Sequence, residues 1–144
     1  SVVGHLGVDI MSSTWDEAIA VAAVQSEPDR GIGDALLDQR LIAGIGNVFR
    51  CESLFICQVN PWTAVSKVDV QSIVHTAAAL MHRNRWNPRQ ITTGDERRGH
   101  EHFVHARGSR ECRRCSTRIE IGRDGIAPQE RLVYWCPRCQ DSTE

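Results

Sequence analysis

Cys112-Arg113-Arg114-Cys115 and Cys136-Pro137-Arg138-Cys139 are two CxxC stretches in the C-terminal part of this chain. Each stretch places two thiolates on one tight turn, and 20 residues separate the two pairs. Two such turns complete the tetrahedral ligand set of a structural zinc site, and this spacing is typical of one. A pair of disulfides and a redox-active CxxC motif are the alternatives. We predict that Cys112, Cys115, Cys136 and Cys139 together bind one structural Zn²⁺ ion.

The residues between the two cysteine pairs favour a β-hairpin. Arg118 to Ile121 alternate between polar and apolar side chains, as in a strand. Gly122-Arg123-Asp124-Gly125 has the composition of a turn, and Arg131 to Trp135 is typical of a returning strand. A hairpin clipped by zinc explains this pattern better than either alternative.

Length and composition indicate a globular protein. The 144 residues are 41% hydrophobic, enough for one domain or two small ones. No apolar run approaches the roughly 20 residues that cross a bilayer, and the N-terminus lacks the order of a signal peptide. We therefore expect a cytoplasmic protein without a membrane partner, in a reducing compartment that favours metal ligation over disulfides. Cys51 and Cys57 lie six residues apart on a predicted helix, cannot bridge each other, and are expected to be buried, inert thiols.

The charge of this chain is unevenly distributed. Residues 1–80 hold four basic residues against nine acidic ones, whereas residues 81–140 hold thirteen arginines against seven acidic residues. Guanidinium groups match phosphate geometry, so a polyanionic partner for the basic half is one interpretation, and a solvated basic face is the other. Lys67 is the one lysine. Because Schiff bases require a lysine or an N-terminal amine, the chain by itself has few options for amine catalysis.

Four helices are predicted before the cysteine pairs, which makes the fold mainly α. Thr14-Trp15-Asp16-Glu17 has the spacing of a capping box and predicts a helix up to Ser26. The expected helices after it run from Ile32 through Ile42, from Asn47 to before Asn60, and from Ser66 or Asp69 to Met81. We expect a helical domain over residues 1–86, a linker over residues 87–108 and a zinc-hairpin domain over residues 109–144.

The stretch Gly44-Ile45-Gly46-Asn47 lies where one predicted helix ends and the next begins. Glycines let the backbone approach a ligand, and free N–H groups at a helix N-terminus favour an anion. The alternative is an ordinary glycine turn with an asparagine N-cap. By itself the pattern leaves both interpretations open.

Several stretches, taken in order, resemble a known family. Leu36–Gln39, Ala43–Phe49, Glu52–Phe55 and Asn60-Pro61 resemble the helix–two-turn–helix element of the formamidopyrimidine-DNA glycosylase and endonuclease VIII family. Arg131–Gln140 resembles the zinc finger of that family, and its Tyr-Trp-Cys-Pro run is most similar to endonuclease VIII. The intervening Asn-Pro-Arg, Thr-Thr-Gly-Asp and His-Phe-Val stretches resemble the approach to the finger in bacterial endonucleases VIII.

This resemblance implies base-excision repair. Enzymes of this kind remove damaged bases from duplex DNA and nick the abasic site by β- or β,δ-elimination, as bifunctional DNA glycosylases and AP lyases. The implied fold is a helix–two-turn–helix module of four helices followed by a zinc-bound β-hairpin. Gly46 and Asn47 would contact the phosphate backbone beside the lesion, and Arg131 would be the finger arginine that grips it. The alternative for Arg131 is a solvated strand residue.

The chain departs from the family at several positions. The family nucleophile is an N-terminal proline followed by glutamate, whereas this chain begins Ser1-Val2-Val3 and lacks the N-terminal domain. We therefore expect the C-terminal half of such an enzyme: a monomer in the bacterial cytoplasm, associated with the nucleoid. It would have no catalytic residue of its own, would be inactive alone, and would have the missing domain as a partner. Ser116 replaces a glycine common after the second cysteine, His105 replaces an aromatic residue, and the segment between the cysteine pairs is longer.

Two other functions remain open. A helix-turn-helix regulator would read bases from its third helix, and a zinc-ribbon module would bind a protein. Glu52 is expected to brace the glycine turn, and Lys67 is a poor candidate nucleophile. His100, His102 and His105 could suggest a second metal site, but solvent or core roles are favoured.

Overall fold

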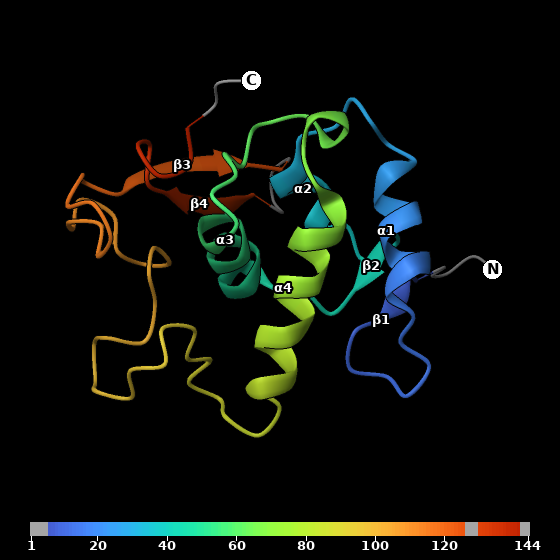
Figure 1. Cartoon of the computed structure of the whole chain (residues 1–144), viewed down its shortest axis with the longest axis horizontal. Helices are drawn as coiled ribbons and strands as arrows, with labels where there is room; N and C mark the ends of the chain where they lie inside the picture. The colour runs from blue at the N-terminus through green and yellow to red at the C-terminus, as the bar shows by residue number, and fades with distance from the viewer. Residues whose placement is uncertain (1–5, 126–129, 142–144) are drawn as a thin grey trace.

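The computed structural model describes residues 6–125 and 130–141 and has the mainly α architecture expected, followed by a β-hairpin (Figure 1). The elements in chain order are β1 (Val8–Asp9), α1 (Glu17–Gln25), α2 (Ile32–Leu36), β2 (Ile42–Ala43), α3 (Asn47–Ile56), the 3₁₀ turn η1 (Val65–Lys67), α4 (Val70–Arg83), β3 (Glu120–Asp124) and β4 (Arg131–Trp135). Among the described residues, no helix is long and apolar enough to cross a membrane.

Helices α3 and α4 begin where the sequence predicts them. Asp69 caps α4 by accepting a hydrogen bond from the Ser72 amide, at 3.1 Å. The predicted cap of α1 was wrong, because Asp16 rather than Thr14 accepts the amide of Ile19. The Thr14 hydroxyl lies instead 2.8 Å from the Ser12 hydroxyl, within a turn that precedes the helix.

The predicted helix from Ile32 to Ile42 was also wrong, because α2 ends at Leu36. Asp38 accepts the amide of Arg40 with its carboxylate, at 3.0 Å, and this local bond turns the chain out of the helix. Ile42 then pairs with Val8 in a short parallel ladder between β1 and β2. Gly44 follows with a φ of 110°, a conformation in which a side chain would be strained.

The hairpin is confirmed, with a longer first strand than predicted. β3 runs antiparallel to β4 from Glu120↔Trp135 to Asp124↔Arg131, so the strand passes through the predicted turn. Gly122 lets the Trp62 ring, which comes from the loop after α3, pack close to the hairpin, since a Cβ atom at Gly122 would lie 3.0 Å from that ring. Residues 126–129, which connect the two strands in the chain, lie outside the described residues.

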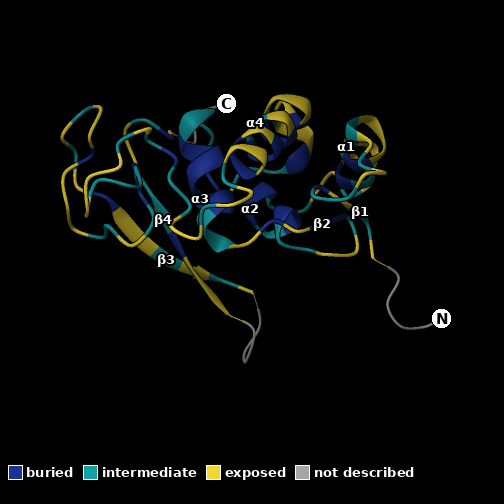
Figure 2. Cartoon of the chain, turned by 90° about the horizontal axis from the view of Figure 1, so that it is seen from below, coloured by how far each residue is buried: buried dark blue, intermediate teal, exposed yellow. Residues whose placement is uncertain are grey.

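Helix α3 belongs to two hydrophobic cores. One face packs with α1, α2 and α4, and Figure 2 shows α3 as the buried layer between α4 and the hairpin. The other face contributes Cys51 and Phe55 to a smaller core against the hairpin. The members that the second half of the chain adds to this smaller core are Val104, Cys112, Ile119 and Cys136. Helix α3 therefore fixes the hairpin relative to the helices.

The segment predicted as a linker holds no helix or strand, yet side chains order it. The buried carboxylate of Glu52 accepts the amides of Phe103, Val104 and His105 at 2.7–2.9 Å, and also the hydroxyl of Thr92. Glu52 thus braces the path from α4 to the hairpin, and not the glycine turn as expected. A buried carboxylate is stable here because each of these donors points at it.

Candidate metal centre and nucleic-acid cleft

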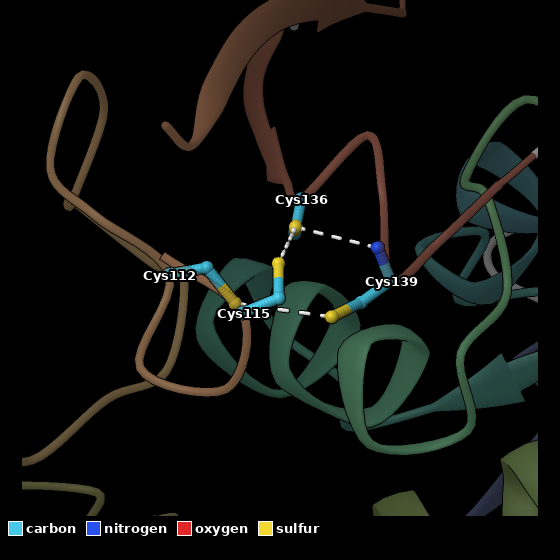
Figure 3. A group of neighbouring side chains, drawn as sticks. All are labelled: Cys112, Cys115, Cys136 and Cys139. Atoms are coloured by element: carbon cyan, nitrogen blue, oxygen red, sulfur yellow. Dashed lines mark hydrogen bonds between the residues drawn. The ribbon is translucent and has the colours of Figure 1, made fainter. Parts of the chain in front are cut away.

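The four cysteines of the two CxxC turns converge (Figure 3). All four Sγ atoms lie within 4.8 Å of one another, with 3.9 Å between Cys112 and Cys139 and 3.5 Å between Cys115 and Cys136. Tetrahedral zinc with Zn–S bonds of about 2.3 Å requires sulfur separations of about 3.8 Å. A disulfide requires about 2 Å, so these four side chains are free thiols with the spacing of a metal ligand set.

Local backbone geometry prepares these cysteines for ligation. The amide of Arg114 donates to Cys112 Sγ at 3.3 Å, and the amide of Cys139 donates to Cys136 Sγ at 3.4 Å. Hydrogen bonding with Thr117 lowers the pKa of Cys115 to about 6, which favours a thiolate. Burial, followed by its neighbouring thiols, raises the pKa of Cys139 to about 12. Cys115 thus favours the thiolate form and Cys139 the thiol form. A cation at the centre would favour the thiolate form of both, because metal binding releases thiol protons.

The remaining cysteines and the histidines stay apart from this centre. Cys51 is buried, whereas Cys57 is half-buried and lies 3.4 Å from the Thr76 hydroxyl, so the expectation of burial holds fully for Cys51 alone. The rings of His102 and His105 pack edge to face at 5.4 Å. Within the described ranges, the four-cysteine cluster is the one group with the closeness of a metal site.

A second feature is a cleft of about 530 Å³ between the helices and the hairpin. Gly44, Ile45, Gly46 and Asn47 form one wall, and Arg131 lies across from them at the start of β4. The residues named from sequence as candidate DNA contacts, Gly46, Asn47 and Arg131, therefore line one cavity. Their role in binding DNA stays a prediction.

Asn47 links the two walls of this cleft. Gly46, and not Asn47, is the N-cap of α3, so the simple asparagine cap is wrong. The Nδ2 atom of the Asn47 side chain donates to the Leu132 carbonyl at 2.8 Å. Its Oδ1 atom accepts a hydrogen bond from the Arg50 guanidinium at 2.6 Å. An amide nitrogen carries two protons, so one donor of Asn47 remains for a ligand in the cleft.

Sequence reasoning missed Arg50, which is completely buried. Besides Asn47, its guanidinium binds the Gly33 carbonyl at 3.2 Å and the Asp124 carboxylate at 2.5 Å. Its position three residues after Asn47 on a helix was the one available signal, because residues at that spacing share a face. Its partner on the hairpin could not be read from the sequence.

Three acidic residues also line the cleft, Asp34, Asp38 and Asp124, and each has an arginine partner. Arg30 binds Asp34 at 2.6 Å and Asp38 at 2.7 Å, while Arg40 also binds Asp38. The hydrogen bond from Arg40, followed by that from Arg30, holds the pKa of Asp38 well below its usual range. These carboxylates are therefore paired with cations within the protein.

Comparison with known proteins identifies the family. Residues 6–85 match the family model described as the formamidopyrimidine-DNA glycosylase H2TH domain. The chain belongs to this family. It is 40% identical over 141 residues to the probable endonuclease 8 2 of Streptomyces coelicolor, covering 96% of this chain and 50% of that protein. It is 38% identical to the DNA-(apurinic or apyrimidinic site) lyase Nei2 of Mycolicibacterium smegmatis, covering 98% of this chain and 55% of that protein.

Solved structures of the H2TH-domain family share the fold. The MutM (Fpg) protein of Thermus thermophilus superposes with a TM-score of 0.73 at 22% identity, over 97% of this chain and 55% of that one. The Lactococcus lactis glycosylase bound to DNA with an AP site gives a TM-score of 0.69 at 23% identity, over 95% and 50%. The chain thus spans about half the length of the relatives it matches.

Proposed function

We propose that this chain is the DNA-binding half of a bifunctional base-excision-repair enzyme, a DNA glycosylase and AP lyase of the endonuclease VIII type. The observation that carries the proposal is the cleft in which Asn47 faces Arg131 across the junction of α3 and β4. The names of the relatives, endonuclease 8 and DNA-(apurinic or apyrimidinic site) lyase, support the reaction class. The substrate of the parent enzyme would be damaged duplex DNA.

Zinc is the metal proposed for the four cysteines. Four cysteines with these sulfur separations suit Zn²⁺, an ion that has no redox chemistry and is bound tetrahedrally by thiolates in structural sites. Its role would be structural, because four protein ligands leave no open position. Holding Cys136 fixes the end of β4, and β4 carries Arg131 at its other end.

The phosphate backbone is the proposed ligand of the cleft. Gly46 leaves the N-terminus of α3 open, and nothing lies within 4 Å of where its Cβ atom would be. The second amide proton of Asn47 and the exposed guanidinium of Arg131 would bind phosphate oxygens without reading bases. Clamps on both sides of a lesion would help to hold an extruded nucleotide, since flipping costs a few kcal/mol.

The chemical steps are assigned to a part of the parent that this chain does not contain. Schiff-base chemistry needs an amine, and the cleft residues include arginines but no lysine. Lys67 lies at the end of η1, away from the cleft. We therefore propose that the chain alone has neither glycosylase nor lyase activity. Borohydride treatment with abasic DNA tests this point, and a covalent adduct on this chain would refute it.

We also propose a domain organisation and a cellular location for this protein. Residues 1–86 would be the DNA-binding helical domain, residues 87–108 a linker and residues 109–144 the zinc-hairpin domain. The protein would act as a monomer in the bacterial cytoplasm, at the nucleoid, with the catalytic domain as its partner.

A binding titration distinguishes the proposed DNA-repair function from the two alternatives, a helix-turn-helix regulator and a zinc-ribbon module that binds a protein. We expect this chain to prefer a duplex with an abasic analogue over undamaged duplex, with affinity that falls steeply as salt rises. Arg131→Gln should remove that preference, whereas Arg110→Gln, an exposed arginine outside the cleft, should keep it. Sequence-dependent affinity would indicate a regulator instead, and binding insensitive to salt and lesion would indicate a protein-interaction module.

A further inference from the structure

Trp86 is the most exposed large apolar side chain among the described residues, at 88%. It follows the end of α4 and borders a separate cavity of about 450 Å³. Phe49 and Met81, both nearly buried, belong to the same cavity. The guanidinium of Arg85 lies 5.9 Å from the centre of the Trp86 ring. We call Trp86, Arg85 and this cavity the Trp86 surface.

The Trp86 surface adjoins the proposed DNA cleft. Cys57 after the end of α3 contacts Ser72 and Thr76 near the start of α4, and Phe49 near the start of α3 lines one cavity with Met81 near the end of α4. The start of α3 therefore lies beside the end of α4. Gly44 in the cleft wall would place a Cβ atom 3.5 Å from the Met81 side chain, which is part of the Trp86 surface. The glycine turn thus separates the two cavities.

The charge around Trp86 suits an anionic partner. The chain carries no acidic residue from Val70 to Gly94, while Arg83, Arg85 and Arg89 fall within this stretch. Arg89 binds Glu101, but Arg83 and Arg85 have no carboxylate partner within residues 6–125 and 130–141. Arg85 beside the exposed indole, with the exposed Arg83 three residues before Trp86 in the chain, combines phosphate attraction with an aromatic face.

We propose that the Trp86 surface binds an unpaired nucleotide of the DNA strand that leaves the cleft. The indole would stack on the base, and Arg83 and Arg85 would bind the neighbouring phosphates. Stacking of this kind needs a free base face, which intact duplex does not offer and a gapped or single-stranded segment does. A purely apolar protein partner would leave the two guanidinium groups unmatched. The proposal rests on the proposed function, because it places the strand relative to the Asn47 cleft.

The experiment compares three DNA probes with the whole chain. The probes are a short single-stranded oligothymidylate, a duplex with a one-nucleotide gap and the same duplex intact, each followed by fluorescence anisotropy. Trp86→Leu should weaken binding to the first two about tenfold and leave the intact duplex unchanged. Trp86→Phe should restore most of the loss, because a phenyl ring still stacks. Since Trp86 is so exposed, both variants should keep the circular dichroism spectrum of the parent chain.

The outcomes separate this proposal from the proposed function. Equal affinity of Trp86→Leu and the parent chain for oligothymidylate would overturn the stacking site and leave the surface to a protein contact. An equal loss on all three probes would also overturn it, because stacking would then not be the cause. If Arg131→Gln has no effect on abasic duplex while Trp86→Leu behaves as expected, the cleft assignment fails and the Trp86 surface stands.

Discussion

The guanidinium of Arg50 lies 2.5 Å from the carboxylate of Asp124, although 74 residues separate them in the chain. Arg50 is completely buried and Asp124 is only 11% exposed. Through the same guanidinium, Asn47 on α3 is joined to the strand that precedes the hairpin tip. One ion pair thus sets how the two walls of the cleft face each other.

Replacing Arg50 should therefore be costly. Arg50→Leu leaves the Asp124 carboxylate without its cation and frees the Asn47 side chain, and loss of one partner of a buried pair costs about 3–5 kcal/mol. Urea denaturation followed by circular dichroism measures this loss. As a matched control, Arg40→Gln removes an exposed partner of Asp38 and should cost far less, because solvent screens exposed ion pairs. Similar losses in both variants would contradict the assigned role.

Glu52→Gln tests the brace between α3 and the segment before the hairpin. A glutamine offers one acceptor oxygen to three backbone amides and the Thr92 hydroxyl, and its NH₂ group would oppose donors. We expect a loss of roughly 3 kcal/mol, with faster hydrogen exchange at Phe103, Val104 and His105. Glu27→Gln, in a surface pair with Arg30, is the control. Unchanged exchange rates at these three amides would refute the brace.

Ser116→Gly should stabilise the first cysteine turn. Ser116 has a φ of 67°, where a Cβ atom is unfavourable, and its amide donates to the Cys112 carbonyl at 2.8 Å. Glycine relieves this strain, partly offset by the greater freedom of the unfolded chain, for a gain of about 0.5–1 kcal/mol. Thermal unfolding of the zinc-loaded protein measures it. Ser116→Ala keeps the Cβ atom and should bring no gain, so equal effects of the two changes would contradict the explanation.

His105 should make stability depend on pH. Burial, followed by the charge of His102, lowers the pKa of His105 below the usual 6.5, and its buried Nδ1 atom has no hydrogen-bond partner among the residues that the structure describes. Below pH 6.5 the unfolded chain then binds more protons than the folded one, so stability falls as the pH falls. His105→Phe should flatten this slope between about pH 5.5 and 7.5. His75→Gln, on the exposed side of α4, should retain it, and parallel curves for His105→Phe and the parent would exclude His105 as the source.

Removing zinc should unfold the hairpin before the helices. Structural zinc contributes folding energy directly, and the smaller core includes two of the four ligands. We expect one zinc per chain by metal analysis. A strong chelator should then move the NMR signals of residues 112–139 to the narrow range of an unfolded chain while the amides of α4 stay protected. A hairpin spectrum unchanged by chelation would refute zinc as its clip.

The sequence alone determined the features that depend on local chemistry and spacing. The two CxxC turns predicted the hairpin with its four converging cysteines, and the apolar repeat predicted a helix from Ser66 or Asp69 to Met81, where α4 runs from Val70 to Arg83. Ordered motifs were sufficient to identify the family. The helix predicted through Ile42 was wrong, because the Asp38 side chain accepts a hydrogen bond from the backbone amide two residues ahead, in place of a helical bond.

Which distant groups meet depends on the three-dimensional fold. The sequence marked Asn47 and Arg131 as candidates, but the cleft between them exists because Arg50 reaches Asp124 and Asn47 reaches the Leu132 carbonyl. Likewise, nothing in the spacing predicted that Glu52 would hold the amides of residues 103–105. A buried polar group needs a hydrogen-bond partner, and the sequence shows that need. The partner can come from any part of the chain, so the sequence does not show which residue provides it.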